Sequence, residues 1–224
     1  MAKIRTEMFR LTVIPGVDVT AAWDEPKNEM PKALVVIAHG AANAYDHPLL
    51  LTVSQKLVKE LSTACLRFNF PYRESGQNVP DPPERLIAAI RAACDHAVSK
   101  HPKLKPFLAG KSLGARVASM MIHSGYAAKG LIFLGYPLHP MGKPDLRKEE
   151  HLYSIKIPML FVQGEKDPYC QSDLLDDLMA KLKNPTLKII EKAGHSYEPI
   201  GSNGKSELNA YVASIVAEWV HSNM

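Results

Sequence analysis

Residues 110–114 read Gly-Lys-Ser-Leu-Gly and place a serine between two glycines. A serine in this pattern can attack a carbonyl carbon when it lies on a sharp turn between a strand and a helix, where only glycines avoid collisions with neighbouring backbone. The surroundings fit this geometry, because residues 106–109 form a short apolar run and apolar residues then recur at helical spacing as far as Gly125. Ser112 is therefore the candidate nucleophile.

A serine nucleophile needs a base and an acid, and both candidates follow strand-like runs. Asp167 comes after the apolar residues 157–162, and His195 comes after residues 186–190. The order serine, acid, histidine along the chain is the order that a strand–turn–helix serine elbow requires. Glu165 is a rival carboxylate, and the Asp-Pro pair also suits an ordinary turn.

In this arrangement His195 would remove the hydroxyl proton of Ser112 and later return a proton to the leaving group. Asp167 would hold the imidazole in the useful tautomer and stabilise its charged form. The chemistry predicted is acyl transfer through a covalent acyl-enzyme.

Acyl transfer also needs two donors for the oxyanion, usually backbone N–H groups. Leu113, directly after the serine, supplies the first. The second is expected in the loop that follows the strand-like run at residues 33–38, where a His-Gly pair precedes two alanines. Ala41 is the predicted donor, with Ala42 as the alternative.

The elements that position these residues alternate between strand and helix. Strand patterns occur near residues 9–14, 17–23, 33–37, 66–70, 107–109, 131–134, 159–162 and 187–190, and helix patterns near 48–61, 83–99, 113–124, 172–182 and 207–221. The first helix is expected to be capped by Asp46. This alternation predicts an α/β fold with a mostly parallel central sheet, helices on both faces, and active residues at the carboxyl ends of the strands.

Composition narrows the class of protein. With 224 residues and 46% hydrophobic content, the chain is expected to form one domain over residues 1–224. The net charge of +4 is small and dispersed, which argues against nucleic acid as a partner. Apolar stretches of about six residues are far below the roughly 20 that cross a bilayer, and the N-terminus lacks the apolar core of a signal peptide. No membrane partner is expected.

Three cysteines, Cys65, Cys94 and Cys170, form an odd set without the spacing of metal ligands. They indicate a reducing compartment, and we expect a cytoplasmic location with neither a metal nor an organic cofactor.

Beyond the three candidate catalytic residues, the segments at 39–50, 67–73 and 110–116 carry a family resemblance. The chain resembles small serine α/β hydrolases of the dienelactone-hydrolase-like branch. Within that branch it is similar to a group of uncharacterised bacterial hydrolase-like proteins, a testis-expressed protein and a subunit of a histone acetyltransferase complex. The resemblance implies an α/β-hydrolase fold. Dienelactone hydrolase itself uses a cysteine nucleophile where this chain has Ser112, so its lactone specificity is not carried over.

Only residues 136–154 are available for an insertion after the strand that follows the nucleophile helix, so a minimal cap domain or none is expected. Six residues near the proposed chemistry are candidates for the substrate pocket: Asn43, Tyr45, Arg73, Tyr136, His139 and Tyr197. Arg73 could bind a substrate carboxylate or form an ion pair with Glu74 or another acid.

The sequence therefore predicts a serine hydrolase of small carboxylic esters or thioesters. The alternative is a catalytically silent α/β-hydrolase-fold module that serves as a binding or scaffold unit. The oligomeric state is left open.

Overall fold

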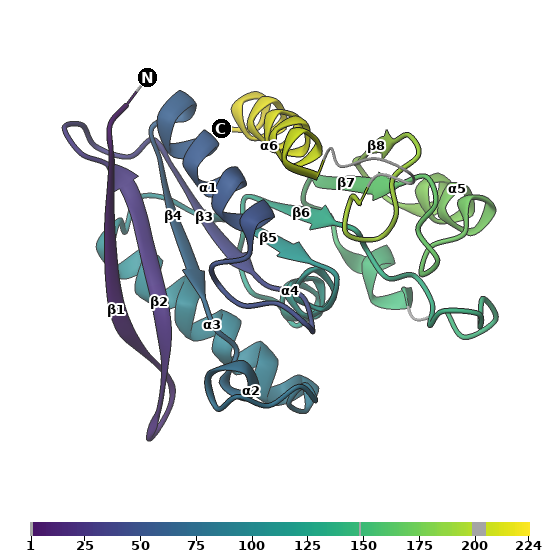
Figure 1. Cartoon of the computed structure of the whole chain (residues 1–224), viewed down its shortest axis with the longest axis horizontal. Helices are drawn as coiled ribbons and strands as arrows, with labels where there is room; N and C mark the ends of the chain where they lie inside the picture. Colours follow the sequence, from purple (N-terminus) through teal and green to yellow (C-terminus); the bar gives the residue numbers. More distant parts are fainter. Residues whose placement is uncertain (1, 148, 199–204) are drawn as a thin grey trace.

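The computed structural model describes residues 2–147, 149–198 and 205–224. Within these ranges the chain forms an eight-stranded sheet in the order β1-β2-β4-β3-β5-β6-β7-β8 (Figure 1). The strands are β1 (Ile4–Ile14), β2 (Val17–Pro26), β3 (Ala33–Ala38), β4 (Thr63–Phe68), β5 (Pro106–Lys111), β6 (Gly130–Leu134), β7 (Met159–Gly164) and β8 (Pro185–Ile190).

The first two strands form an antiparallel hairpin, and β2 pairs with β4 in the same antiparallel sense. From β4 to β8 every neighbouring pair is parallel. Parallel strands end at a common edge, so the residues that follow β3, β5, β7 and β8 meet there. That edge receives all of the predicted catalytic groups.

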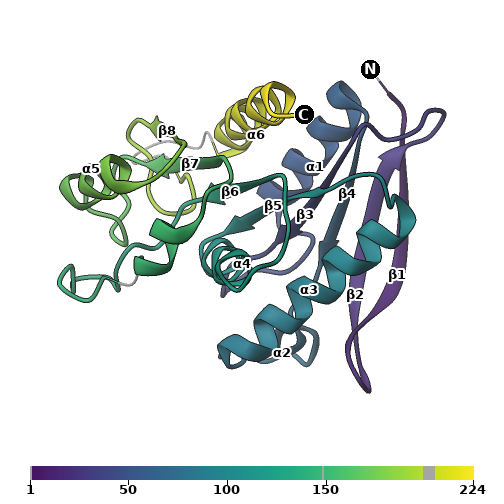
Figure 2. The same cartoon turned by 180° about the vertical axis from the view of Figure 1, so that it is seen from behind.

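Helices cover both faces of the sheet (Figures 1 and 2). α1 (Pro48–Leu61) and α6 (Lys205–Ser222) pack on one face, and α3 (Pro83–Lys100) and α4 (Leu113–His123) pack on the other. The remaining helical segments are α2 (Pro71–Glu74), α5 (Ser172–Lys181) and the 3-10 helix η1 (Glu150–Ser154). No helix in the described part of the chain has both the length and the apolarity needed to cross a bilayer.

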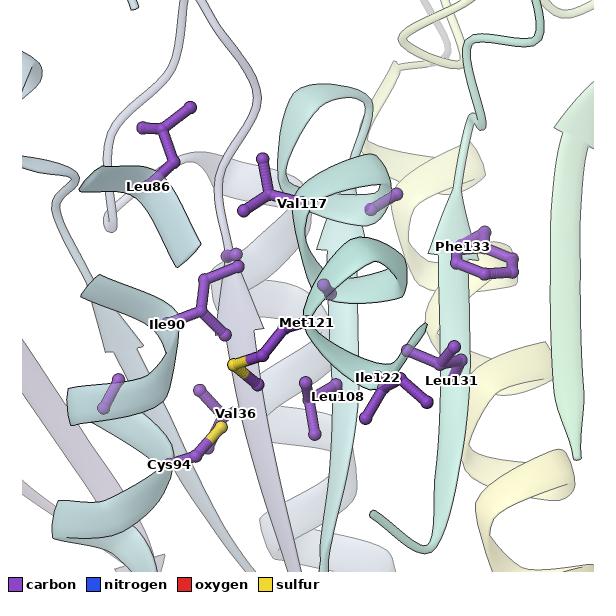
Figure 3. Close-up of a cluster of buried hydrophobic side chains, with 14 of the residues drawn as sticks. Val36, Leu86, Ile90, Cys94, Leu108, Val117, Met121, Ile122, Leu131 and Phe133 are labelled. Carbon is purple, nitrogen blue, oxygen red and sulfur yellow. The ribbon is translucent and has the colours of Figure 1, made fainter. Parts of the chain in front are cut away.

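The two faces are filled by alternate residues of the central strands, because successive strand side chains point to opposite sides. On β3, Val35 joins the cluster under α1 and α6, whereas Val36 joins the cluster under α3 and α4. Figure 3 shows the second cluster, in which Ile90 of α3 and Met121 of α4 meet above Val36 and Leu108. Burial of these two apolar layers holds the edge with the candidate site in place.

The predicted architecture is confirmed, including the absence of a large cap: between β6 and β7, the described residues 136–147 and 149–154 form loop segments and the short η1. One local prediction was wrong. The N-cap of α1 is His47, whose Nδ1 accepts the backbone N–H of Leu49 at 3.3 Å, and not Asp46. Pro48 occupies the first helical position, which makes its immediate predecessor the cap.

Candidate active site

Ser112 lies at the turn between β5 and α4, with backbone angles of φ 49° and ψ −110° that non-glycine residues rarely adopt. The flanking glycines allow this turn. A Cβ atom on Gly110 would lie 2.3 Å from the backbone nitrogen of Ala115, and one on Gly114 would lie 2.6 Å from the carbonyl oxygen of Ala38. Because both obstacles are backbone atoms, only glycine fits at either position.

The structure brings the three candidate catalytic side chains into one hydrogen-bonded line. Ser112 Oγ lies 2.8 Å from His195 Nε2, and His195 Nδ1 lies 2.7 Å from Asp167 Oδ2. A carboxylate can only accept, so Nδ1 carries the proton and Nε2 is free to accept from the serine hydroxyl. The carboxylate is fully buried and the imidazole is mostly buried. This geometry suits general-base activation of a nucleophile.

Asp167 is oriented by its own set of donors. Its Oδ1 accepts the backbone N–H of Tyr169 at 2.8 Å, and its Oδ2 accepts from the Nε2 of Gln163 as well as from His195. Gln163 is itself fixed, since its Oε1 accepts the backbone N–H of Tyr136 at 2.9 Å. The rival carboxylate, Glu165, lies at the surface and pairs with Lys166 instead.

The loop that carries His195 is anchored by the two residues that follow the histidine. Lys111, buried at the end of β5, donates from Nζ to Ser196 Oγ at 2.9 Å. Tyr197 adopts a positive φ of 56° and donates its hydroxyl to the carbonyl oxygen of Val162 at 2.7 Å. These contacts join the histidine loop to β5 and β7, the strands that precede the serine and the aspartate.

The loop after β3 approaches the serine closely. A Cβ atom on Gly40 would lie 3.5 Å from Ser112 Cβ and 2.8 Å from Asn43 Oδ1, so the backbone at Gly40 sits beside the nucleophile. Within the described ranges, the N–H groups of Ala41 and Leu113 donate to no protein acceptor. Asn43 is half-buried in this loop. The assignment of Ala41 and Leu113 as oxyanion donors stays a prediction that this placement supports.

His39 holds that loop in its conformation. Burial lowers the pKa of His39 to about 4, so the ring is neutral near pH 7. Its Nε2 accepts the backbone N–H of Phe70 at 2.9 Å, which leaves Nδ1 to donate to the carbonyl oxygen of Gly40 at 2.8 Å. The hydroxyl of Tyr72 donates to the carbonyl oxygen of Ala41 at 2.8 Å. Together these bonds position the proposed second oxyanion donor.

Two predicted pocket residues have a different place. Tyr136 and Tyr197 are fully buried in the two apolar clusters, where they support the strands below the site. The sequence places Tyr136 in the loop expected to border the pocket and Tyr197 close to His195, but the large apolar rings of both are driven inward. His139 borders a cavity, with both ring nitrogens engaged by the backbone of Pro140 and Gln171.

Arg73 makes no ion pair with its neighbour. Its Nη1 donates to Asn78 Oδ1 at 2.8 Å, while Glu74 pairs with Arg10. The proposed Arg73–Glu74 pair was therefore wrong. Although burial opposes ionisation of Glu74, hydrogen bonds to its carboxylate lower its pKa to about 2. Tyr45 is half-buried in the loop after β3, and its role at the site stays a prediction.

Sequence reasoning missed two residues that contact the candidate catalytic side chains. Gln163 carried a usable signal, because it is a polar residue at the end of an otherwise apolar strand. Tyr169 carried none: its ring centroid lies 4.6 Å from that of His195, a contact that depends on the folded loops.

The described residues include no group of three or more His, Cys, Asp or Glu side chains arranged to hold a metal ion. Cys65, Cys94 and Cys170 are buried and unpaired, and burial raises the pKa of each thiol. They act as small core residues and not as nucleophiles.

Comparison with known proteins gives a consistent result. The profile of the alpha/beta hydrolase domain family matches residues 31–221. Among solved structures, the chain is similar to Est1E from Butyrivibrio proteoclasticus with bound ferulic acid (19% identity, TM-score 0.79, 96% of this chain and 98% of that chain).

Two further structures cover the chain almost completely. A serine hydrolase without a lid from Xanthomonas campestris shares 19% identity at a TM-score of 0.76, over 96% of this chain and 95% of that one. A dienelactone hydrolase from Anabaena variabilis shares 19% identity at a TM-score of 0.76, over 99% of both chains. At these identities the likeness establishes a common fold.

Proposed function

Because the chain belongs to the alpha/beta hydrolase domain family, we propose that it is a serine hydrolase that cleaves small carboxylic esters or thioesters. The observation that carries this proposal is the hydrogen-bonded line from Ser112 through His195 to Asp167. A strained serine, a neutral acceptor nitrogen and a buried carboxylate form the arrangement that activates a hydroxyl at neutral pH.

The reaction begins when Ser112 Oγ attacks the carbonyl carbon of the substrate and His195 Nε2 takes the hydroxyl proton. Asp167 stabilises the resulting imidazolium through the bond to Nδ1. The oxyanion is stabilised by the N–H groups of Ala41 and Leu113. His195 then donates its proton to the leaving oxygen or sulfur as the tetrahedral intermediate collapses to an acyl-enzyme.

In the second half of the reaction, the residues keep these roles and water is the nucleophile. His195 removes a proton from the water that attacks the acyl carbon, and Ser112 regains its proton when the acid is released. The same residues serve both steps, so losing any one of them removes most of the rate.

The segment at residues 136–154 is too short to form a separate cap over the site. The similar structure from Xanthomonas campestris is described as having no lid, and Est1E was solved with ferulic acid bound. For this chain we infer an open site that accepts small acyl groups from solvent.

The decisive test combines labelling with turnover. A fluorophosphonate should modify purified protein at Ser112 alone, as located by peptide mass spectrometry, and 4-nitrophenyl acetate should be hydrolysed. Ser112→Ala should abolish both while the thermal unfolding midpoint stays close to that of the native protein. His195→Ala should also abolish labelling, because the serine then has no base.

Ser119 provides a matched control. Its Oγ lies 2.8 Å from His151 Nε2, so it also contacts an imidazole, but it is buried within α4. Ser119→Ala should keep labelling and activity. A folded native protein that neither reacts with the probe nor hydrolyses esters would overturn the proposal and favour a binding or scaffold module.

A further inference from the structure

A cavity of about 210 Å³ lies next to the catalytic histidine. Its lining consists of Arg116, Pro137, Leu138, His139, Pro140, Leu146 and Tyr169. Tyr169 borders both the cavity and the site, because its ring packs against that of His195 and its N–H donates to Asp167. The mechanism described above leaves this space unused.

Arg116 places a cation at this cavity close to the nucleophile. It lies one turn along α4 from Ser112, and its backbone N–H donates to the carbonyl oxygen of Ser112 at 3.1 Å. A helical side chain leans toward the N-terminal end of its helix, which here is the end that carries Ser112. The guanidinium and the nucleophile therefore share one end of α4.

The guanidinium of Arg116 is not neutralised by the protein. In residues 2–147, 149–198 and 205–224 it forms neither an ion pair nor a side-chain hydrogen bond, whereas nearby Arg147 pairs with Glu149 and Asp177. His151 adds no second positive charge near pH 7, because burial and then the charge of Arg116 lower its pKa to about 4.

Apart from the hydroxyl of Tyr169, the other lining side chains are apolar or already engaged. The ring nitrogens of His139 are bound by backbone atoms, and Pro137, Leu138 and Leu146 offer only carbon surface. A ligand that fits must therefore combine a short apolar chain with one anionic group. A carboxylate matches the planar donor fork of a guanidinium and can accept two hydrogen bonds from it.

We propose that this cavity is a substrate subsite in which Arg116 binds a carboxylate, so that the preferred substrates are short esters or thioesters carrying a free carboxylate away from the scissile bond. The inference rests on the proposed ester hydrolysis. The apolar walls accommodate the intervening methylene groups, and Arg116 recognises the charged end.

Turnover of matched esters tests the subsite. The monomethyl esters of succinate, glutarate and adipate place a carboxylate on the acyl side, with methyl butanoate, pentanoate and hexanoate as uncharged controls. Acetoxybutanoate and butyl acetate form the corresponding pair for the alcohol side. In at least one series, kcat/KM should favour the charged ester, and Arg116→Gln should lower it about 10- to 100-fold while changing the uncharged ester less than about twofold.

Two further variants make the result specific. Arg116→Lys should retain part of the preference, because it keeps the charge and loses the fork. Arg91→Gln removes the same charge from exposed α3, where Arg91 lies over the ring of Tyr126, and should change nothing. The subsite is rejected if no charged ester is preferred, or if Arg116→Gln lowers charged and uncharged esters equally.

A binding measurement separates failure of the subsite from failure of the proposed function. Ser112→Ala protein cannot turn over an ester, so the affinities of monomethyl glutarate and methyl pentanoate can be compared by NMR titration. The charged ester should bind at least about tenfold more tightly, and the difference should disappear in Ser112→Ala/Arg116→Gln. Equal affinities for the charged and uncharged esters overturn the subsite. Absence of fluorophosphonate labelling in native protein overturns only the proposed hydrolysis.

Discussion

At the scale of single residues, the alignment of the site depends on polar groups held inside an apolar strand end. Asp167 receives hydrogen bonds from His195, Gln163 and the backbone of Tyr169, and these fix both carboxylate oxygens. Gln163 is buried, and its other end accepts a backbone N–H. The carboxylate can therefore direct the imidazole only in the orientation that faces Ser112.

Replacement of Gln163 tests this role. Gln163→Met keeps the size of the side chain but removes the donor to Asp167 and leaves the N–H of Tyr136 without its acceptor. Because hydrogen bonds to charged groups are among the stronger ones, we expect kcat to fall about 10- to 100-fold. Steady-state kinetics and the rate of fluorophosphonate labelling measure the effect, with Gln77→Met at the exposed surface as a control. Unchanged rates would show that Gln163 serves packing alone.

At the scale of elements, the loops at the carboxyl ends of the strands are more tightly fixed than their irregular backbone suggests. The loop after β3 is bound by the neutral ring of His39 and by the hydroxyl of Tyr72. The backbone of Tyr45 in the same loop is held from both sides, by Asn69 and by Arg67. A loop held by these bonds would present the N–H of Ala41, the proposed oxyanion donor, as a preorganised group.

This arrangement makes stability depend on pH. The pKa of His39 is lowered from 6.5 to about 4 by burial, so the unfolded chain takes up a proton at higher pH than the folded protein. The contribution of neutral His39 to the unfolding free energy is present above pH 6.5 and is lost as the pH falls toward 4. From this residue we expect a loss of about 2 kcal/mol in unfolding free energy between pH 7 and pH 5.

Urea unfolding of native protein and of His39→Gln at the two pH values measures this difference. The variant cannot titrate at this position, so its loss should be smaller than that of the native protein by about the same 2 kcal/mol. His151, whose pKa is also lowered, contributes with the same sign to both proteins and cancels in the comparison. Equal losses in the two proteins would contradict the assignment of a neutral, buried His39.

At the scale of the whole molecule, one buried ion pair connects the antiparallel hairpin to the parallel sheet and to the site. Arg67 on β4 binds Asp24 on β2 at 2.8 Å, and both side chains are almost completely buried. Asp24 also accepts from Ser54 of α1, while Arg67 donates to the carbonyl oxygen of Tyr45. The strands β2 and β4, the helix α1 and the loop after β3 therefore share one polar network.

Disrupting this network should lower the unfolding free energy substantially. Asp24→Ala leaves the guanidinium of Arg67 buried without its partner, for which the expected loss in unfolding free energy is about 3–5 kcal/mol. Lys56→Ala removes one member of the partly exposed Lys56–Glu60 pair on α1 and should cost less than about 1 kcal/mol. Denaturant unfolding of the two variants beside native protein measures the contrast, and similar losses would refute the structural importance of the buried pair.

The sequence by itself determined the fold class and the identity of the three aligned side chains. These features are local in the sequence and act locally in the structure. Apolar runs with strand or helix periodicity form strands and helices, and Gly110 and Gly114, which lack Cβ atoms, permit the turn at Ser112. Ser112, Asp167 and His195 could then be selected because each comes after a strand-like run.

Only the tertiary structure decided how those ends meet and what surrounds them. Three features depend on how separate segments fold together. They are the hydrogen bond from Gln163 to Asp167, the inward packing of Tyr136 and Tyr197, and the cavity at Arg116. Such contacts depend on the order of strands in the sheet and on the packing of loops above its edge. Periodicity and spacing along a chain carry no information about these long-range distances.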